Sequence, residues 1–215
     1  MPRPLPARVL AETGGDADAV RNHILDAAHR VVSTHGLAAA STRAIATEAG
    51  LGAGTLYNYF DDRLQLLAQS ILRRATVLAD SLADLPSRAG TDTVPANLRR
   101  AVRRALIVLD ELVPLLAAAF SDPELLDAFR LEMTRHASDL DPARAVEHYL
   151  LAERDRGRVA LDADCKAAAS VLVSLCHDHA FHRFLRGDTR KPKLPIEEVD
   201  LVAKALTRSA RPQQH

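Results

Sequence analysis

The sequence lacks tryptophan, and aromatic residues make up only 4% of its 215 residues. Aromatic and β-branched residues usually dominate the strands of sandwiches and barrels, so this scarcity disfavours such folds. Hydrophobic residues, chiefly Ala, Leu and Val, account for 47%. That share is ordinary for a globular protein and too high for a disordered one. The composition therefore favours a folded chain with little sheet.

An excess of charge of either sign is also missing, because 28 Lys and Arg residues balance 28 Asp and Glu residues. A histone-like protein that packs nucleic acid needs clustered excess cations to neutralise phosphates, so the balance excludes that class. It does not exclude a small DNA-reading head whose charge is diluted by a larger neutral body.

Cysteine is scarce, and no long apolar run is present. Cys165 and Cys176 would lie about 16 Å apart on one helix, too far for a disulfide, so they indicate a reducing cytosol. Prolines near the N-terminus occupy the place where a signal peptide needs an apolar run. The longest apolar stretch, residues 112–120, contains Pro114 and is too short to span a bilayer. We therefore expect a cytoplasmic protein with no membrane partner.

Apolar residues recur at helical spacing along most of the chain, and Asp, Gly and Pro occur where helices start and stop. The pattern predicts roughly nine helices and no strand, an all-α fold, with Pro114 interrupting one helix. The helix from Asp162 to about Arg186 is apolar nearly all round, which predicts a central buried helix. The predicted helices cover about 16–35, 42–49, 52–59, 63–85, 95–113 and 162–186, with others opening at Asp122, Asp141 and Pro195.

The most informative segment is residues 41–60, where two short helices flank a glycine-containing turn. This is the pattern of a helix-turn-helix, whose second helix enters the major groove of DNA. Gly50 can adopt the positive φ that such a turn requires. The small core beneath the motif is predicted to come from four apolar residues: Ile45, Leu51, Leu56 and Phe60.

At these residues the sequence resembles the TetR family of transcriptional repressors. The resemblance covers about residues 18–68, and the remainder agrees with the family in length and helix count. The residues that match the family's fingerprint are Thr42, Ile45-Ala46, Ala49-Gly50, Leu51, Gly54-Thr55-Leu56-Tyr57, Tyr59-Phe60 and Arg63.

The resemblance implies DNA contacts for residues of both short helices. Thr42 and Arg43 are expected to contact phosphate and a base edge, and Arg63 to replace the family's lysine on a phosphate. The small residues of the second helix are expected to allow close approach, and Asn58 to reach a base. The full set of expected DNA-binding residues is Thr42, Arg43, Ala53, Gly54, Thr55, Tyr57, Asn58, Tyr59 and Arg63.

Two departures from the family pattern weaken the expected base readout. Gly52 stands where a serine usually caps the second helix, so the cap is weaker and one phosphate-facing hydroxyl is absent. Ala53 stands where a longer polar residue is common. Direct readout is therefore expected to depend on Arg43, Asn58 and Tyr57.

The resemblance also implies the domain organisation. A flexible arm over 1–15 is expected to precede a helix-turn-helix domain over 16–62. A connecting helix over 63–85 then leads to a ligand-binding and dimerisation domain over 86–215. The last helices, near 163–186 and 196–209, are expected to pair with their copies in a homodimer, which implies a palindromic operator.

The helical body has enough apolar surface to enclose a small apolar or amphipathic molecule. Each candidate, taken singly, is better explained as a core residue. The pocket candidates are Phe120, Phe129, Met133, Tyr149, Cys176, His177 and Phe181.

No catalytic or cofactor motif is evident, and we expect neither an enzyme nor a bound metal. Asp178 and His182 share a helix face, but His177 and His179 diverge from each other, which is a poor arrangement for metal ligation. Two alternatives remain open. One is an all-helical metal-binding protein or enzyme, and the other is a regulator that responds to a protein partner instead of a small molecule.

The head itself is nearly neutral, which predicts weak non-specific DNA binding. Residues 1–75 carry eight arginines (3, 8, 21, 30, 43, 63, 73, 74) and seven acids (12, 16, 18, 26, 48, 61, 62), for a net charge of +1.

Overall fold

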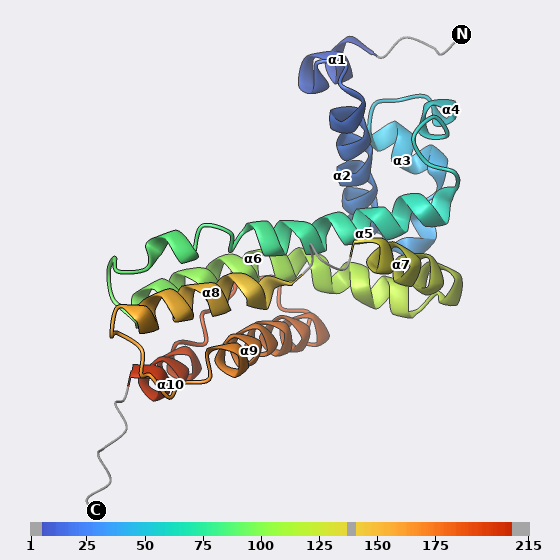
Figure 1. Cartoon of the computed structure of the whole chain (residues 1–215). Helices are drawn as coiled ribbons and strands as arrows, with labels where there is room; N and C mark the ends of the chain where they lie inside the picture. Colours follow the sequence, from blue (N-terminus) through green and yellow to red (C-terminus); the bar gives the residue numbers. More distant parts are fainter. Residues whose placement is uncertain (1–5, 137–140, 208–215) are drawn as a thin grey trace, which may run out of the picture. The chain divides into compact units, whose positions relative to one another are not determined.

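The computed structural model describes residues 6–136 and 141–207, and those residues form α-helices, short 3-10 helices and turns without any strand (Figure 1). The predicted all-α fold is confirmed. The chain divides into two compact units. Unit 1 comprises Met1–Ala75 and Pro114–Ala137, and unit 2 comprises Thr76–Val113 and Ser138–His215.

Unit 1 is built around the long helix α2, against which α1, α3 and the 3-10 helix η1 pack, while α3 packs against α4. The beginning of α5, the end of α6 and all of α7 complete the unit. The elements of this unit are α1 (Ala7–Thr13), α2 (Ala17–His35), η1 (Leu37–Ala39), α3 (Thr42–Glu48), α4 (Ala53–Leu56), α5 (Arg63–Asp80), α6 (Val94–Phe120) and α7 (Pro123–Arg135).

The segment that was predicted to be a flexible arm contains helix α1. Val9 and Thr13 are buried on its inner side, and Gly14 ends it in the left-handed conformation at φ 62°. The Glu12 carboxylate lies 3.4 Å from the Nδ1 atom of His23 on α2. Apolar packing and this pair therefore order a helix that the local Pro and Gly content concealed. Arg3 lies outside the described residues.

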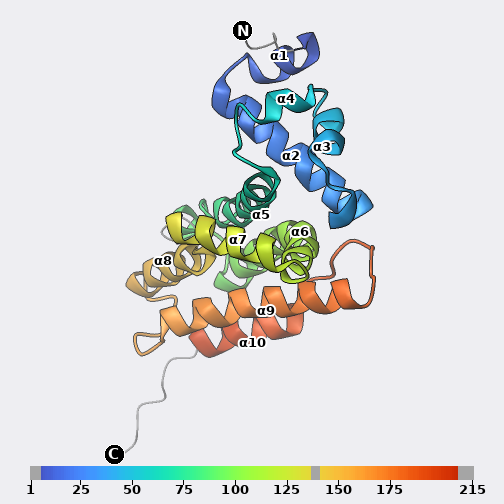
Figure 2. The same ribbon diagram turned by 90° about the vertical axis from the view of Figure 1, so that its right-hand side faces the viewer.

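Unit 2 contains the remainder of α5 and α6 with the helices that follow residue 140. α8 packs against α9 and η2, and α9 packs against α10, as Figure 2 shows. The elements that complete it are η2 (Pro86–Arg88), α8 (Pro142–Asp155), α9 (Cys165–Leu185) and α10 (Ile196–Thr207).

Most of the predicted helix starts agree with the structure. Asp16, Asp122 and Asp141 each accept a backbone N–H at the start of α2, α7 and α8. The start of α9 was predicted at Asp162, but the capping residue is Asp164, two residues later, which accepts the N–H of Ala167 at 2.9 Å. The helix starts are thus set by side-chain caps, and the sequence alone misplaced one of them.

The predicted break at Pro114 is wrong, because α6 continues through it from Val94 to Phe120. Proline's fixed φ is compatible with a helix, and the loss is one backbone hydrogen bond and some crowding. Val113 and Leu115 on either side are buried, so apolar packing of both segments offsets that loss.

Helix α9 was predicted to be central and buried, and this is wrong for the single chain. Only one stripe of α9 is buried, comprising Cys165, Ala169, Leu172, Cys176, Ala180 and Arg183. Val171 is 53% exposed and Leu185 is 62% exposed. Its apolar composition therefore serves two faces, of which one packs inside unit 2 and the other is uncovered.

Two sets of polar groups buried in unit 2 connect its elements. Asn97 and Tyr149 are fully buried, and the Asn97 amide donates to the Tyr149 hydroxyl at 3.2 Å. Glu153, also fully buried, lies 3.3 Å from Arg158 and accepts the Gly90 N–H at 3.3 Å. These contacts attach the segment before α6 to α8. Within the described ranges, no helix combines the length and the hydropathy that crossing a bilayer requires.

Candidate nucleic-acid interface and ligand cavity

The turn between α3 and α4 is set by Gly50. Its φ is 69°, a left-handed conformation that glycine adopts without steric cost. The Leu51 N–H donates to the Ala46 carbonyl at 2.8 Å and the Gly50 N–H to the Thr47 carbonyl at 3.0 Å, the paired bonds of a Schellman motif. The predicted core beneath the turn is also present, since all four of its residues are buried: Ile45, Leu51, Leu56 and Phe60.

Helix α4 is a single turn, shorter than the predicted helix over 52–59. Its capping position is Gly52, which offers no side-chain hydrogen bond. Beyond Leu56 the chain continues as a turn, with the Asn58 N–H donating to the Thr55 carbonyl at 3.1 Å. Glycine, threonine, tyrosine and asparagine all have modest helix propensity, which accounts for the short length.

The residues expected to contact DNA fall into two groups by exposure. Ala53, Gly54, Tyr57 and Asn58 are exposed, with 59% of Tyr57 accessible, whereas Thr55 and Tyr59 are half-buried. On α3, Arg43 is exposed and forms no ion pair or side-chain hydrogen bond within the described residues, and Thr42 is half-buried. Helix α3 therefore presents Arg43 to solvent, and the turn that follows α4 presents Tyr57 and Asn58.

Arg63 is placed differently from its expected role on a phosphate. Its Nε donates to the Ala40 carbonyl at 2.8 Å and its Nη2 to the Leu37 carbonyl at 3.1 Å. Two of its N–H groups thus hold the segment that leads into α3. The resemblance gave no sign of this bracing contact.

A groove between α2 and α3 also escaped prediction from the sequence. Across it the Arg30 guanidinium pairs with the Glu48 carboxylate at 2.6 Å. Arg43 stands on its rim with hydroxyl-bearing neighbours. The groove is lined by Arg30, Val31, Thr34, His35, Ala39, Ser41, Arg43, Ala44, Thr47 and Glu48.

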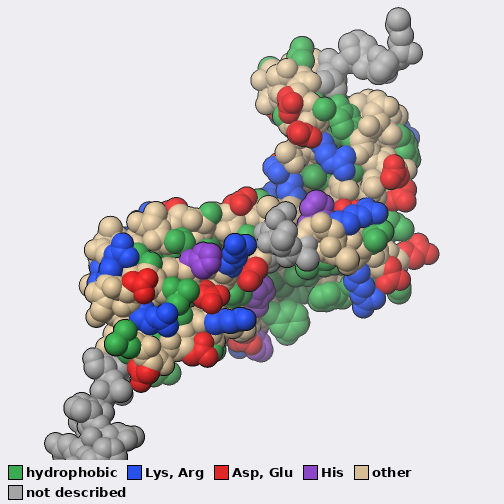
Figure 3. Space-filling model, in the orientation of Figure 1, with side chains coloured by type: hydrophobic (Ala, Val, Ile, Leu, Met, Phe, Trp, Pro, Cys, Tyr) green, Lys and Arg blue, Asp and Glu red, His purple; other side chains and the backbone are tan. Residues whose placement is uncertain are grey.

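Several acids of the head are neutralised locally by neighbouring cations. Asp26 on α2 accepts from Arg73 through both carboxylate oxygens, at 3.1 and 3.2 Å, and from Arg74 at 3.3 Å. Glu48 pairs with Arg30, as described above. Acidic and basic side chains also alternate over the visible face of unit 2 in Figure 3. Near-zero charge is therefore distributed as local pairs instead of opposed patches.

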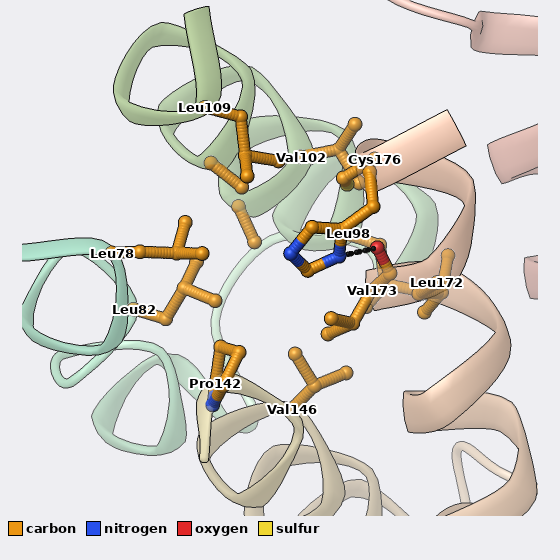
Figure 4. Close-up of a pocket in the computed structure, with 13 residues that line it drawn as sticks. Leu78, Leu82, Leu98, Val102, Leu109, Pro142, Val146, Leu172, Val173 and Cys176 are labelled. Carbon is orange, nitrogen blue, oxygen red and sulfur yellow. Dashed lines mark hydrogen bonds between the residues drawn. The ribbon is translucent and has the colours of Figure 1, made fainter. Parts of the chain in front are cut away.

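Unit 2 contains an apolar cavity between α5, α6, α8 and α9. In Figure 4, Leu78 of α5 and Leu82, in the turn that follows α5, lie across from Val173 and Cys176 of α9. The free volume at its centre is about 20 Å³, little more than a single water molecule needs. Its lining residues are Leu78, Leu82, Leu98, Ala101, Val102, Ala105, Leu109, Pro142, Val146, Leu172, Val173, Cys176 and His177.

The two polar side chains of this lining, Cys176 and His177, are consecutive residues on α9. The Nδ1 atom of His177 is 2.9 Å from the Val173 carbonyl, the hydrogen bond dashed in Figure 4. Burial raises the pKa of the Cys176 thiol to about 12, so the thiol is protonated at neutral pH. The cavity is therefore apolar apart from one imidazole and one thiol.

Of the seven predicted pocket residues, the structure brings only Cys176 and His177 to this cavity. Tyr149 is fully buried elsewhere against Asn97, and Phe181 is exposed. The other three belong to unit 1, and the aliphatic residues that form most of the lining were not predicted. The residues that lie in unit 1 are Phe120, Phe129 and Met133.

The histidine-rich end of α9 carries one local pair, in which His182 Nε2 lies 3.4 Å from the Asp178 carboxylate. Over residues 6–136 and 141–207, no three His, Cys, Asp or Glu side chains form a group that could hold a metal ion.

The helix-turn-helix has a clear counterpart among known proteins. Residues 24–69 match the family model described as bacterial regulatory proteins of the TetR family. This segment is therefore a helix-turn-helix of the TetR type. The matched residues run from α2 through the two short helices into α5, so the similarity rests on the same segment that the structure folds around Gly50.

A curated relative agrees with that similarity. The HTH-type transcriptional regulator PksA of Bacillus subtilis is 31% identical over 125 residues, which cover 58% of this chain. The matched region spans 56% of PksA, little more than half of its length.

Solved structures show the same fold at low sequence identity. FadR of Bacillus subtilis, in complex with stearoyl-CoA, has a TM-score of 0.59 at 16% identity, covering 88% of this chain and 99% of FadR. SmeT, the repressor of a Stenotrophomonas maltophilia multidrug efflux pump, has a TM-score of 0.59 at 20% identity, covering 90% and 94% respectively.

Proposed function

We propose that this protein is a DNA-binding transcriptional repressor of the TetR family. It binds a palindromic operator as a homodimer and is released when a small apolar or amphipathic molecule occupies the unit 2 cavity. The observation that carries the proposal is the exposed set of Arg43, Tyr57 and Asn58 on a helix-turn-helix whose turn is fixed by Gly50. Arginine, tyrosine and asparagine side chains are among the groups that contact phosphates in protein–DNA complexes.

The DNA contact itself follows from the donors that remain uncommitted. Arg43 retains its guanidinium for phosphate or for the major-groove edge of guanine, and Asn58 suits adenine. The exposed Tyr57 hydroxyl can donate to a phosphate. Gly54 has no other atom within 4 Å of where a Cβ would stand, so the space around it is open for a DNA strand.

The uncovered faces of α9 and α10 support a homodimer. Large apolar side chains on them are exposed, and a contiguous apolar surface of this kind marks a protein interface. In a two-fold dimer each patch meets its own copy, which gives a four-helix interface and two heads on one operator. The exposed residues of these two helices are Val171, Phe181, Phe184, Leu185, Ile196 and Leu201.

Ligand-dependent release is supported by the apolar cavity and by two structurally similar proteins. FadR was solved with stearoyl-CoA and SmeT is named as a repressor of an efflux pump. A ligand that binds one of two conformations more tightly shifts the population toward that conformation. If that conformation binds DNA less tightly, the ligand lowers the affinity for DNA, and DNA lowers the affinity for the ligand by the same factor.

The test begins with operator selection from random duplex DNA by the full-length protein, followed by anisotropy titration of the selected site. Arg43→Ala and Tyr57→Ala should each weaken specific binding by about 5- to 150-fold, as expected from a loss of about 1–3 kcal/mol when a specific contact is removed. Arg103→Ala is the matched control, because Arg103 is an exposed arginine on α6 in unit 2. Unchanged binding by both head variants, or no selected sequence at all, would overturn the proposal.

A further inference from the structure

The polar groups in the lining of the unit 2 cavity define a narrower class of ligand than apolar molecules in general. We propose that it takes a compact, uncharged molecule, hydrocarbon for most of its surface, that donates one O–H hydrogen bond to the Nε2 atom of His177. Alcohols and phenols belong to this class. The inference rests on the ligand-responsive part of the proposed function and names the class of ligand.

The first step is the protonation of His177. Its Nδ1 atom faces the Val173 carbonyl at 2.9 Å, and a carbonyl oxygen only accepts hydrogen bonds, so Nδ1 carries the proton. In the neutral ring Nε2 then holds a lone pair and acts as an acceptor. The Val173 carbonyl, one helical turn before His177, thus fixes the tautomer of the His177 ring.

The second step is the direction of that acceptor. The two nitrogens of imidazole point away from each other, and Nδ1 points back to the backbone of its own helix. Nε2 is consequently directed away from α9, and His177 lines the cavity. Nε2 has no hydrogen-bond partner within the described residues, so an acceptor stands ready for a ligand.

The third step excludes charged ligands. The cavity lining contains no Lys, Arg, Asp or Glu. An ion transferred here would lose its hydration without gaining a counter-charge, at a cost of several kcal/mol. The Cys176 thiol, held protonated by burial, adds no charge. Carboxylates, phosphates and quaternary amines are therefore disfavoured, in contrast to the acyl-CoA found in FadR.

The fourth step concerns size. The central free volume of about 20 Å³ is far smaller than any such ligand, so binding must spread the lining apart. The movable lining is aliphatic, with Leu78 on α5, Leu82 in the turn after it and Val146 on α8. Displacing such side chains costs packing energy, which favours compact molecules over long chains.

The test uses three probes of the same shape with the full-length protein: 4-propylphenol, its methyl ether 4-propylanisole, and 4-propylbenzoate at pH 8. Isothermal titration should give saturable binding of the phenol, with Kd about tenfold lower than for the ether, because a hydrogen bond to a buried acceptor contributes about that factor. The benzoate should bind more weakly than either. Equal affinity for phenol and ether, tighter binding of the benzoate, or no binding of the phenol would each overturn the proposal.

Variants assign the acceptor to His177. His177→Leu should bind phenol and ether equally, whereas His182→Leu, a matched exposed change on the same helix, should keep the preference. In wild-type protein the ¹⁵N resonance of His177 Nε2 should move with the phenol and stay with the ether, which keeps the test valid if His177→Leu fails to fold. A preference that survives in a folded His177→Leu, or a resonance that the phenol does not move, would overturn the assignment.

These titrations contain no DNA, so they fail separately from the proposed function. Phenol binding together with absent operator binding would leave the cavity assignment standing and overturn the regulatory role. Operator binding without phenol binding would do the reverse.

Discussion

Arg183 on α9 donates two hydrogen bonds of 3.2 Å to the Asp110 carboxylate on α6, from Nε to Oδ1 and from Nη2 to Oδ2. The same guanidinium donates to the backbone carbonyls of Asp188 and Arg190, which follow α9. Its side chain is only 10% exposed. Leu109, the neighbour of Asp110, lines the cavity, and so does Cys176 on the same helix as Arg183. One arginine therefore connects the two cavity walls formed by α6 and α9.

Removal of Arg183 should destabilise unit 2. Arg183→Met leaves Asp110 without its bidentate partner and two carbonyls without a donor, and we expect a loss of about 1–3 kcal/mol in the free energy of unfolding. The figure is below that of a fully buried pair because Asp110 retains contact with solvent. Urea titration followed by circular dichroism measures the loss.

The control for that prediction is Arg190→Met, since Arg190 pairs with Asp188 at an exposed site. Exposed pairs contribute at most about 1 kcal/mol. Equal losses of unfolding free energy in the two variants would show that the contribution of Arg183 to stability does not depend on its burial.

Arg43 and Arg63 should differ in the salt dependence of operator binding. Each phosphate contact contributes about −0.9 to the slope of log K against log salt concentration. Arg43→Ala should make the slope shallower by about that amount, whereas Arg63→Met should lower stability and leave the slope unchanged, because its donors bind Ala40 and Leu37. A shallower slope in Arg63→Met would mean that Arg63 also reaches a phosphate.

The wild-type slope should itself be small. Glu48 forms an ion pair with Arg30, and Asp26 forms one with Arg73. Few cations of the head are therefore available for phosphates. Binding to random duplex at physiological salt is expected to be weak, and tight binding there would contradict the expectation. Anisotropy with a scrambled duplex provides the measurement.

Alkaline pH should destabilise the protein through Cys176. Its pKa in the folded state is about 12, against about 8.5 in an unfolded chain. Because the folded pKa is the higher one, the stabilisation is fully present below about pH 8.5 and is lost as pH rises toward 12. The slope approaches about 1.4 kcal/mol per pH unit between these values. Burial also raises the pKa of Tyr149, which adds to the loss above about pH 10.

Urea titrations between pH 8 and 10.5 check this dependence. Cys176→Ala should have a lower stability throughout, because it leaves a void, but a shallower pH slope than wild type. Cys165→Ala serves as a thiol control. A slope in Cys176→Ala equal to that of wild type would assign the alkaline loss to other groups.

The dimer should separate when charge is placed on the uncovered faces. Phe184→Glu with Leu201→Glu changes one exposed residue on each of α9 and α10, and each change acts twice in a two-fold interface. Burial of such a side chain stabilises by about 1.5–3 kcal/mol, so sedimentation should show monomers at micromolar concentration. Leu131→Glu on α7, with a comparable exposed fraction of 53%, should remain dimeric. A dimer that persists in the double variant would place the interface elsewhere.

The local features of the head could be predicted from the sequence, because each depends on a few neighbouring residues. Gly50 sets the turn, and Ile45, Leu56 and Phe60 are spaced to meet beneath it. The role of Arg63 could not be predicted, because its partners at Leu37 and Ala40 are defined only once η1 has folded.

Most of the lining of the cavity could not be predicted from the sequence, for a related reason, and only Cys176 and His177 were among the candidates. Aromatic and sulfur-containing side chains were natural candidates, yet the lining is chiefly Leu, Val and Ala. An aliphatic residue looks the same in sequence whether its face is packed, uncovered or beside a void. The two faces of α9 illustrate this, since only packing separates the buried Leu172 from the exposed Val171.

Pro114 gives α6 a mechanical property that follows from a single missing donor. The Asp110 carbonyl, one turn earlier, has no N–H to accept from at position 114, so this stretch resists bending less than the rest of the helix. Compact packing also changes units between Val113 and Pro114. The two hydrogen bonds from Arg183 thus hold this helix of 27 residues at the residue whose carbonyl lacks its helical partner. A displacement of α9 would therefore pull on α6 where one backbone restraint is missing.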